Sequence, residues 1–178
     1  MVEPEPEIPP HFTTYTSESL FSISYPPDLV LDTESMETIY PEIPLEDLPP
    51  VFSGDIPIEG GSYAYIMVMV SLMPAGWTLD ELAEEGSQYR RNNQPGFLEY
   101  SRDKTIVDGR EALILKYRIW SLDIGELRNL DLLTVKDGLL WWVMCWAEPE
   151  DFKDYEDTFY SILRSFRILT HWWSWWVM

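Results

Sequence analysis

The pattern of apolar and polar positions predicts a series of strands interrupted by two helices. Leu20–Tyr25 alternates between a small polar side and an apolar side, which is typical of a half-buried strand. Phe12–Thr16 and Val51–Ser53 predict two more short strands. Ser62–Met73 and Leu139–Ala147 contain continuous apolar runs, so both faces of these two strands need to be covered.

Two segments have the periodicity of amphipathic helices. The first begins at Thr78, which forms a capping box with Glu81, and extends to about residue 91. Its expected buried face consists of Leu79, Leu82, Ala83 and Tyr89. The second covers residues 149–165 and repeats apolar side chains at steps of three and four. Its expected buried face consists of Phe152, Tyr155, Phe159, Ile162, Leu163 and Phe166.

Two Asp-Gly pairs, at 108–109 and 137–138, predict tight hairpin turns. The first joins strand 97–107 to strand 110–120, and the second joins strand 127–136 to strand 139–147. Tight hairpins make the sheet antiparallel, and such a sheet usually leaves one face in water. Because two strands are apolar on both faces, a helix is needed on each side. We therefore predict an α+β fold in which an antiparallel β-sheet is sandwiched between helices, as three α/β/α layers.

Three motifs carry a resemblance to a known family. They are LFSISYPPD at 20–28, DGREA at 108–112, and DGLLWWVMCWAEPEDFKDYEDTFYSILRSF at 137–166. In this order and at this separation they resemble the PsbP/Mog family, which includes the photosystem II subunit PsbP, a Ran-binding nuclear import factor and uncharacterised envelope proteins. The resemblance implies the same three-layer fold and a role in binding rather than catalysis.

Composition predicts one folded domain at residues 12–169 with an extension on each side. Residues 1–11 form a Pro/Glu-rich stalk or linker, and residues 170–178 form a Trp-rich C-terminal tail. In the PsbP/Mog family such a stalk often follows a lipidated cysteine or a cleaved leader. The resemblance therefore implies an extracytoplasmic or envelope-associated protein of the kind that includes lipoproteins, whose targeting segment has been replaced by Met1.

The net charge of −19 is unevenly distributed, because every Lys and Arg lies at or after Arg90. An acidic surface of this kind repels phosphate backbones, so we expect no nucleic-acid partner. The charge is consistent with an acidic face for a basic protein or for cations, but solubility or a salty habitat explains it more directly.

The sequence lacks the motifs of common enzymes. There is no phosphate-binding glycine loop, zinc-ligand spacing or nucleophile elbow, and His11 and His171 lie at opposite ends of the chain. Cys145 lies within an apolar strand, where a cysteine usually behaves as a small buried hydrophobe. We therefore expect neither catalytic residues nor a cofactor.

An acidic segment is the candidate metal site. Its hard oxygen ligands would suit calcium, although they do not have EF-hand spacing. The candidate ligands are Asp32, Glu34, Glu37, Glu42, Glu46 and Asp47. The alternative is a solvated acidic loop that binds no metal.

The tail holds four tryptophans: Trp172, Trp173, Trp175 and Trp176. They could bind a protein partner, because tryptophan dominates binding hot spots, or they could lie at a membrane surface. Packing of the tail on the chain's own domain and an appended, non-native end are the alternatives. The net negative charge favours a protein partner over an anionic bilayer.

The sequence thus favours a non-enzymatic binding or accessory domain that docks onto a larger envelope or membrane protein complex. One alternative is a structural protein that self-associates through its Trp-rich tail. The other is a carrier of a small ligand or calcium.

Overall fold

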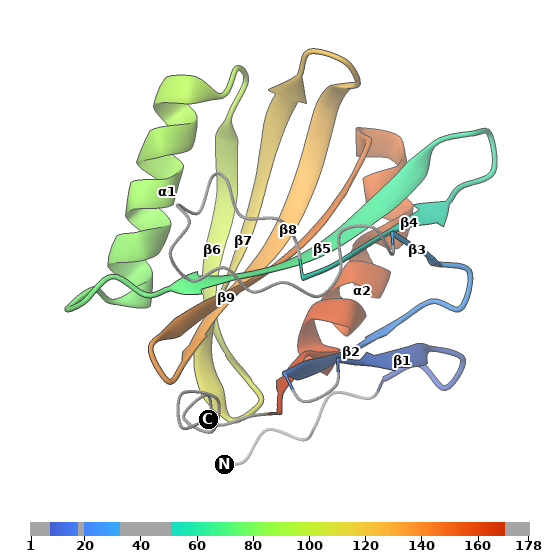
Figure 1. Ribbon diagram of the computed structural model, residues 1–178. Helices are drawn as coiled ribbons and strands as arrows, with labels where there is room; N and C mark the ends of the chain where they lie inside the picture. Colours follow the sequence, from blue (N-terminus) through green and yellow to red (C-terminus); the bar gives the residue numbers. More distant parts are fainter. Residues whose placement is uncertain (1–7, 18–19, 33–50, 170–178) are drawn as a thin grey trace.

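The computed structural model describes residues 8–17, 20–32 and 51–169, which form two antiparallel sheets and two helices (Figure 1). The larger sheet has seven strands in the order β3-β4-β5-β9-β8-β7-β6. They are β3 (Val30–Leu31), β4 (Phe52–Pro57), β5 (Tyr63–Leu72), β6 (Leu98–Val107), β7 (Arg110–Ser121), β8 (Gly125–Lys136) and β9 (Leu139–Ala147). The smaller sheet, in the order β1-β2-β10, consists of β1 (Thr13–Thr16), β2 (Phe21–Tyr25) and β10 (Arg167–Ile168).

The main core lies between the larger sheet and a layer formed by α2 (Pro149–Ser165) with the smaller sheet. The ring of Phe21 on β2 packs against Trp141 on β9 and against Phe166, with centroid distances of 5.8 and 5.7 Å. Ser165 joins the helix to β2, because its hydroxyl accepts a hydrogen bond from the Ser24 N–H at 2.8 Å. The apolar face predicted for this helix is confirmed.

The opposite face of the larger sheet is covered by α1 (Leu79–Asn93). The helix begins with the predicted capping box: the Glu81 N–H donates to the Thr78 hydroxyl, and the Thr78 N–H donates to the Glu81 carboxylate. Ala83 packs here against apolar side chains of β7 and β8. The predicted antiparallel sheet between two helices is therefore confirmed.

Both predicted Asp-Gly hairpins are present. Asp108 and Asp137 have φ values of 53°, and the glycines that follow have φ values of 71° and 78°. A two-residue turn with positive φ at both positions matches the twist of the strands that it joins. The β7–β8 connection has no such pair, and its exposed turn carries Leu122 and Ile124.

Three features differ from the sequence prediction. Tyr89 is 51% exposed, so its expected place on the buried face of α1 was wrong, and Arg90 is buried instead. β5 is less buried than its apolar run predicted: Tyr63 and Leu72 at its ends are exposed, and Tyr65 and Met67 are half-buried. The two-residue strands β3 and β10 were not predicted, because two residues carry no periodicity.

Candidate functional site

A buried charged cluster attaches α1 to the sheet. The Arg90 guanidinium lies between the rings of Tyr117 and Trp142, 4.7 and 5.0 Å from their centroids. One of its nitrogens is 3.7 Å from Oδ2 of Asp131. That oxygen also accepts hydrogen bonds from the Tyr117 hydroxyl and the Trp142 indole N–H, both at 2.8 Å.

Burial dominates the electrostatics of this cluster. Asp131 is only 1% exposed, and burial raises its pKa to about 6, although Arg90 and the two hydrogen bonds oppose the shift. Its second oxygen, Oδ1, is buried and has no hydrogen-bond partner among the residues that the structure describes. Because Arg90 is also buried, we interpret the cluster as a device that positions α1 rather than as a contact surface.

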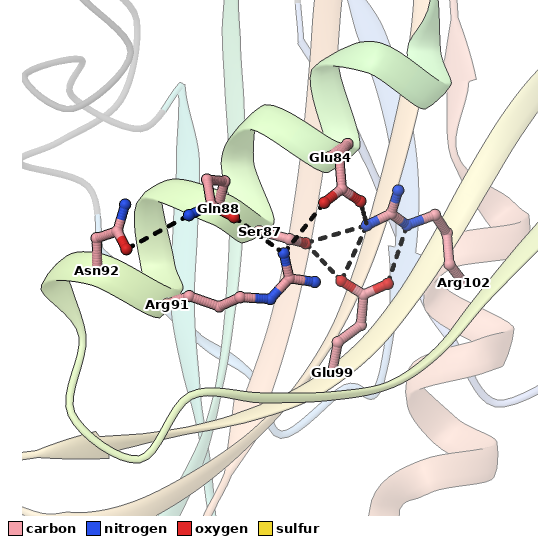
Figure 2. Close-up of polar contacts among 7 residues, drawn as sticks. All are labelled: Glu84, Ser87, Gln88, Arg91, Asn92, Glu99 and Arg102. Atoms are coloured by element: carbon pink, nitrogen blue, oxygen red, sulfur yellow. Dashed lines mark hydrogen bonds and ion pairs between the residues drawn. The ribbon is translucent and has the colours of Figure 1, made fainter.

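A second, more exposed network joins α1 to β6 (Figure 2). Arg102 on β6 pairs with Glu99 at 2.9 Å and with Glu84 on the helix at 3.2 Å. Burial raises the pKa of Glu99, but hydrogen bonds from Arg102 and Ser87 outweigh it and lower the pKa overall. Glu84 also pairs with Arg91 at 3.0 Å. Such exposed pairs orient the helix more than they stabilise it.

A shallow groove of about 670 Å³ runs along the outer side of α1. Its lining residues are Ala75, Gly76, Trp77, Glu81, Glu84, Glu85 and Gln88. Two of its three glutamates already have partners: Glu81 is part of the capping box, and Glu84 pairs with Arg91 and Arg102. The groove therefore gives the acidic-face hypothesis little support.

The other face of the sheet carries a different surface. There α2 packs mainly on β5, β8 and β9, and large apolar side chains near the β7–β8 turn remain exposed. Trp120 is 53% exposed and Leu122 is 90% exposed. We call this the hairpin surface, and it consists of Leu98, Tyr100, Arg118, Trp120, Leu122, Ile124 and Arg128.

Two arginines lie at its centre. Arg118 on β7 is directly opposite Arg128 on β8, and Leu98 on β6 is opposite Arg118. Glu126 pairs with both arginines. Its Oε2 lies 3.4 Å from a terminal nitrogen of Arg118, and its Oε1 lies 3.4 Å from Nε of Arg128. Nε of Arg118 is buried and has no hydrogen-bond partner in the described part of the chain. A pocket of about 400 Å³, lined by Tyr100, Ser101, Lys116, Arg128 and Tyr160, adjoins the pair.

Most of the residues predicted as sites lie outside the described residues. This applies to Glu34, Glu37, Glu42, Glu46, Asp47 and to Trp172, Trp173, Trp175 and Trp176. Of the calcium candidates, Asp32 alone is described, and its N–H donates to the Ser53 carbonyl at 2.9 Å. Among the residues described, no group of three or more His, Cys, Asp or Glu is arranged to hold a metal. Calcium binding stays a prediction.

The expectation for Cys145 is confirmed. The side chain is fully buried on β9, and burial raises the pKa of its thiol well above the usual value. A thiol without solvent access and with a raised pKa is a poor nucleophile.

Comparison with known proteins identifies the fold. No family model matches the sequence, and no curated protein is significantly similar to it. Among solved structures, the chain superposes on cyanobacterial PsbP (CyanoP) of Synechocystis sp. PCC 6803, with a TM-score of 0.62 and 16% identity over 89% of this chain and 92% of that one. The chain has the PsbP/Mog1 fold.

Two further structures have this fold at lower identity. LpqN of Mycobacterium tuberculosis, described as involved in cell envelope biogenesis, has a TM-score of 0.58 and 12% identity over 89% of this chain and 91% of LpqN. The Ran-binding protein Mog1p of Saccharomyces cerevisiae has a TM-score of 0.57 and 9% identity over 89% of this chain and 95% of Mog1p. At such identities the likeness shows the PsbP/Mog1 fold alone.

The hairpin surface was missed by sequence reasoning. Alternation along β7 places Arg118 and Trp120 on the same face as the buried Ile114, so the pattern by itself suggested burial. The sign that was available is the change from Ile114 to Lys116, Arg118 and Trp120 along that face, which indicates that the core ends there.

As for a membrane role, neither described helix is long and apolar enough to cross a bilayer.

Proposed function

We propose that this protein is a non-enzymatic accessory protein that docks onto a larger protein complex of the cell envelope or membrane. The hairpin surface is the observation that carries the proposal. It combines Trp, Tyr and Arg side chains, the types enriched in binding hot spots, with exposed aliphatic residues. Clustered exposed apolar side chains of this kind commonly mark interaction sites.

Two structural neighbours each support one part of the proposal. Mog1p is a Ran-binding protein, which supports a binding role, and LpqN is involved in cell envelope biogenesis, which supports a place in the envelope. The second candidate function is self-association through the Trp-rich tail, favoured by the four tryptophans within residues 172–176.

Site-specific crosslinking tests this function. A photoreactive amino acid is placed at Leu122, and a matched control is placed at Asp157, an exposed position on α2. In cells that naturally make the protein, we expect a discrete adduct with a different envelope protein from position 122 only. Equal labelling from both positions, or no adduct at all, contradicts docking at this surface. An adduct with the mass of two copies would favour self-association.

A further inference from the structure

The hairpin surface has a composition that indicates the chemistry of its partner. We propose that it binds a protein segment in which carboxylate side chains are flanked by large apolar side chains. The inference rests on the proposed docking function and specifies the class of partner.

The two arginines supply the first argument. Like charges placed directly opposite each other on neighbouring strands repel, and Arg118 and Arg128 share the Glu126 carboxylate at 3.4 Å from each. Two guanidinium groups against one carboxylate leave donors for another acceptor. The side chains of Arg118 and Arg128 are 40% and 37% exposed, so a partner can reach their terminal nitrogens. Guanidinium groups bind carboxylates in a planar, bidentate manner, which makes an incoming Asp or Glu side chain a suitable partner.

The surroundings of the arginines supply the second argument. Leu98 and Trp120 lie beside Arg118, and Leu122 and Ile124 project from the adjoining turn. On the other side, the pocket beside Arg128 offers hydroxyls of Tyr100, Ser101 and Tyr160. An apolar rim next to a polar, cationic centre matches a segment whose acidic residues have apolar neighbours.

The acids of this region argue against a bilayer as the occupant. Asp123 lies in the turn between Leu122 and Ile124, so insertion of these two side chains would carry a carboxylate toward the hydrocarbon. A protein partner avoids this cost, because it can place its own donors opposite Asp123.

Selection from a phage-displayed library of random dodecapeptides tests the proposal without assuming a partner. The full chain is the target, and the double variant Arg118→Gln/Arg128→Gln is used for counter-selection. We expect enriched peptides that contain Asp or Glu next to Trp, Leu, Ile or Phe. As synthetic peptides, they should bind the double variant at least tenfold more weakly. Replacement of their acids by the corresponding amides should produce a similar loss.

Matched variants separate this effect from misfolding. Arg91→Gln removes an exposed arginine of α1 on the other face of the sheet and should leave peptide binding unchanged. Leu122→Ser should weaken binding at least threefold without lowering the melting temperature. Selection of no peptides, of purely apolar peptides or of basic peptides would overturn the proposal, as would equal binding to the double variant.

The crosslinking experiment separates failure of the proposed function from failure of this inference. Suppose that a partner is captured at position 122 and is still labelled in the Arg118→Gln/Arg128→Gln variant. This result supports docking but overturns the carboxylate–arginine contact. Selected acidic peptides without any cellular adduct support the contact but contradict docking onto a larger complex. A lipid surface is tested with zwitterionic phosphatidylcholine vesicles. If the wild type binds them, the Leu122→Ser variant does not, and no peptide is selected, the hairpin surface binds lipid instead.

Discussion

At the residue scale, the unusual feature is a charged pair inside an apolar layer. Arg90 and Asp131 are 7% and 1% exposed, and the arginine is further held by two aromatic rings. Removing one partner of a buried pair usually costs more than the pair contributes, because an uncompensated charge remains. The pair therefore makes the position of α1 depend on side chains from three different strands.

The raised pKa of Asp131 predicts a specific pH dependence. The folded state holds the Asp131 proton more tightly than the unfolded state, so this stabilisation is fully present below pH 3.8 and is lost as pH rises through about 6. Relative to Asp131→Asn, the wild type should lose about 2 kcal/mol of unfolding free energy between pH 4.5 and 7.5. Urea unfolding of both proteins at each pH measures this difference. Parallel pH profiles would show that the Asp131 pKa is not raised.

Cys145 provides a simple test of core packing. Because the thiol is fully buried and its pKa is raised, a thiol reagent at pH 8 should not label the native protein. Denaturant should expose one reactive thiol per chain, which serves as the control. Rapid labelling without denaturant would contradict the position of β9 at the centre of the sheet.

At the element scale, local sequence signals specified the helices and hairpins well. The capping box, the two Asp-Gly turns and the apolar stripe of α2 each depend on residues close together in sequence. The buried face of α1 was predicted less well, because periodicity alone favoured Tyr89 over its charged neighbour. The signal for Arg90 lay elsewhere: Asn129 and Asp131 alternate with Leu127 and Leu133 on one buried face of β8, which indicated a polar partner on that face.

The capping box of α1 gives an element-scale prediction. Thr78→Ala removes the oxygen that accepts from the Glu81 N–H, so unfolding free energy should fall by about 1 kcal/mol. Glu85→Ala, at an exposed interior position of the same helix, should change it by less than about 0.5 kcal/mol. Thermal unfolding followed by circular dichroism measures both. Equal effects of the two substitutions would contradict a specific contribution from the cap.

The acidic segment that contains the calcium candidates gives a second element-scale prediction. We expect millimolar calcium to leave the melting temperature almost unchanged at constant ionic strength, as for a solvated acidic loop. The candidate ligands are Asp32, Glu34, Glu37, Glu42, Glu46 and Asp47. A site saturated a hundredfold above its dissociation constant would add about 2.7 kcal/mol, which is several degrees for a domain of this size. Differential scanning calorimetry with calcium, and with magnesium as the control, distinguishes the two outcomes.

At the scale of the whole molecule, the fold was predictable because two independent constraints agree. Tight hairpins require an antiparallel sheet, and strands that are apolar on both faces require helices on both sides. The strand order and the separate β1-β2-β10 sheet could not be predicted, because they depend on contacts between distant segments, such as Phe21 with Ile168. The hairpin surface is exposed because α2 covers only part of one face of the sheet. The position of α2 on the sheet also depends on contacts between distant segments.

The Trp-rich tail gives the last prediction. Each tryptophan can bury ~200 Å², worth about 5 kcal/mol at ~25 cal/mol per Å², so four exposed rings would forgo a large stabilisation. Both faces of the central sheet already carry a helix. We therefore expect Trp172, Trp173, Trp175 and Trp176 to be buried against another molecule or a second copy.

Comparison of the full chain with a variant truncated after Thr170 tests this expectation. Five of the nine tryptophans remain in the truncated chain, so the difference in acrylamide quenching between the two proteins isolates the tail. Light scattering gives the mass of each species. A full-length species heavier than a monomer, reduced to a monomer by truncation, would show self-association. In a lipid-free monomer, we expect the tail rings to be accessible to quencher until a partner is added. Shielded rings in such a monomer would instead show that the tail packs on its own domain, because no other surface is then available to cover them.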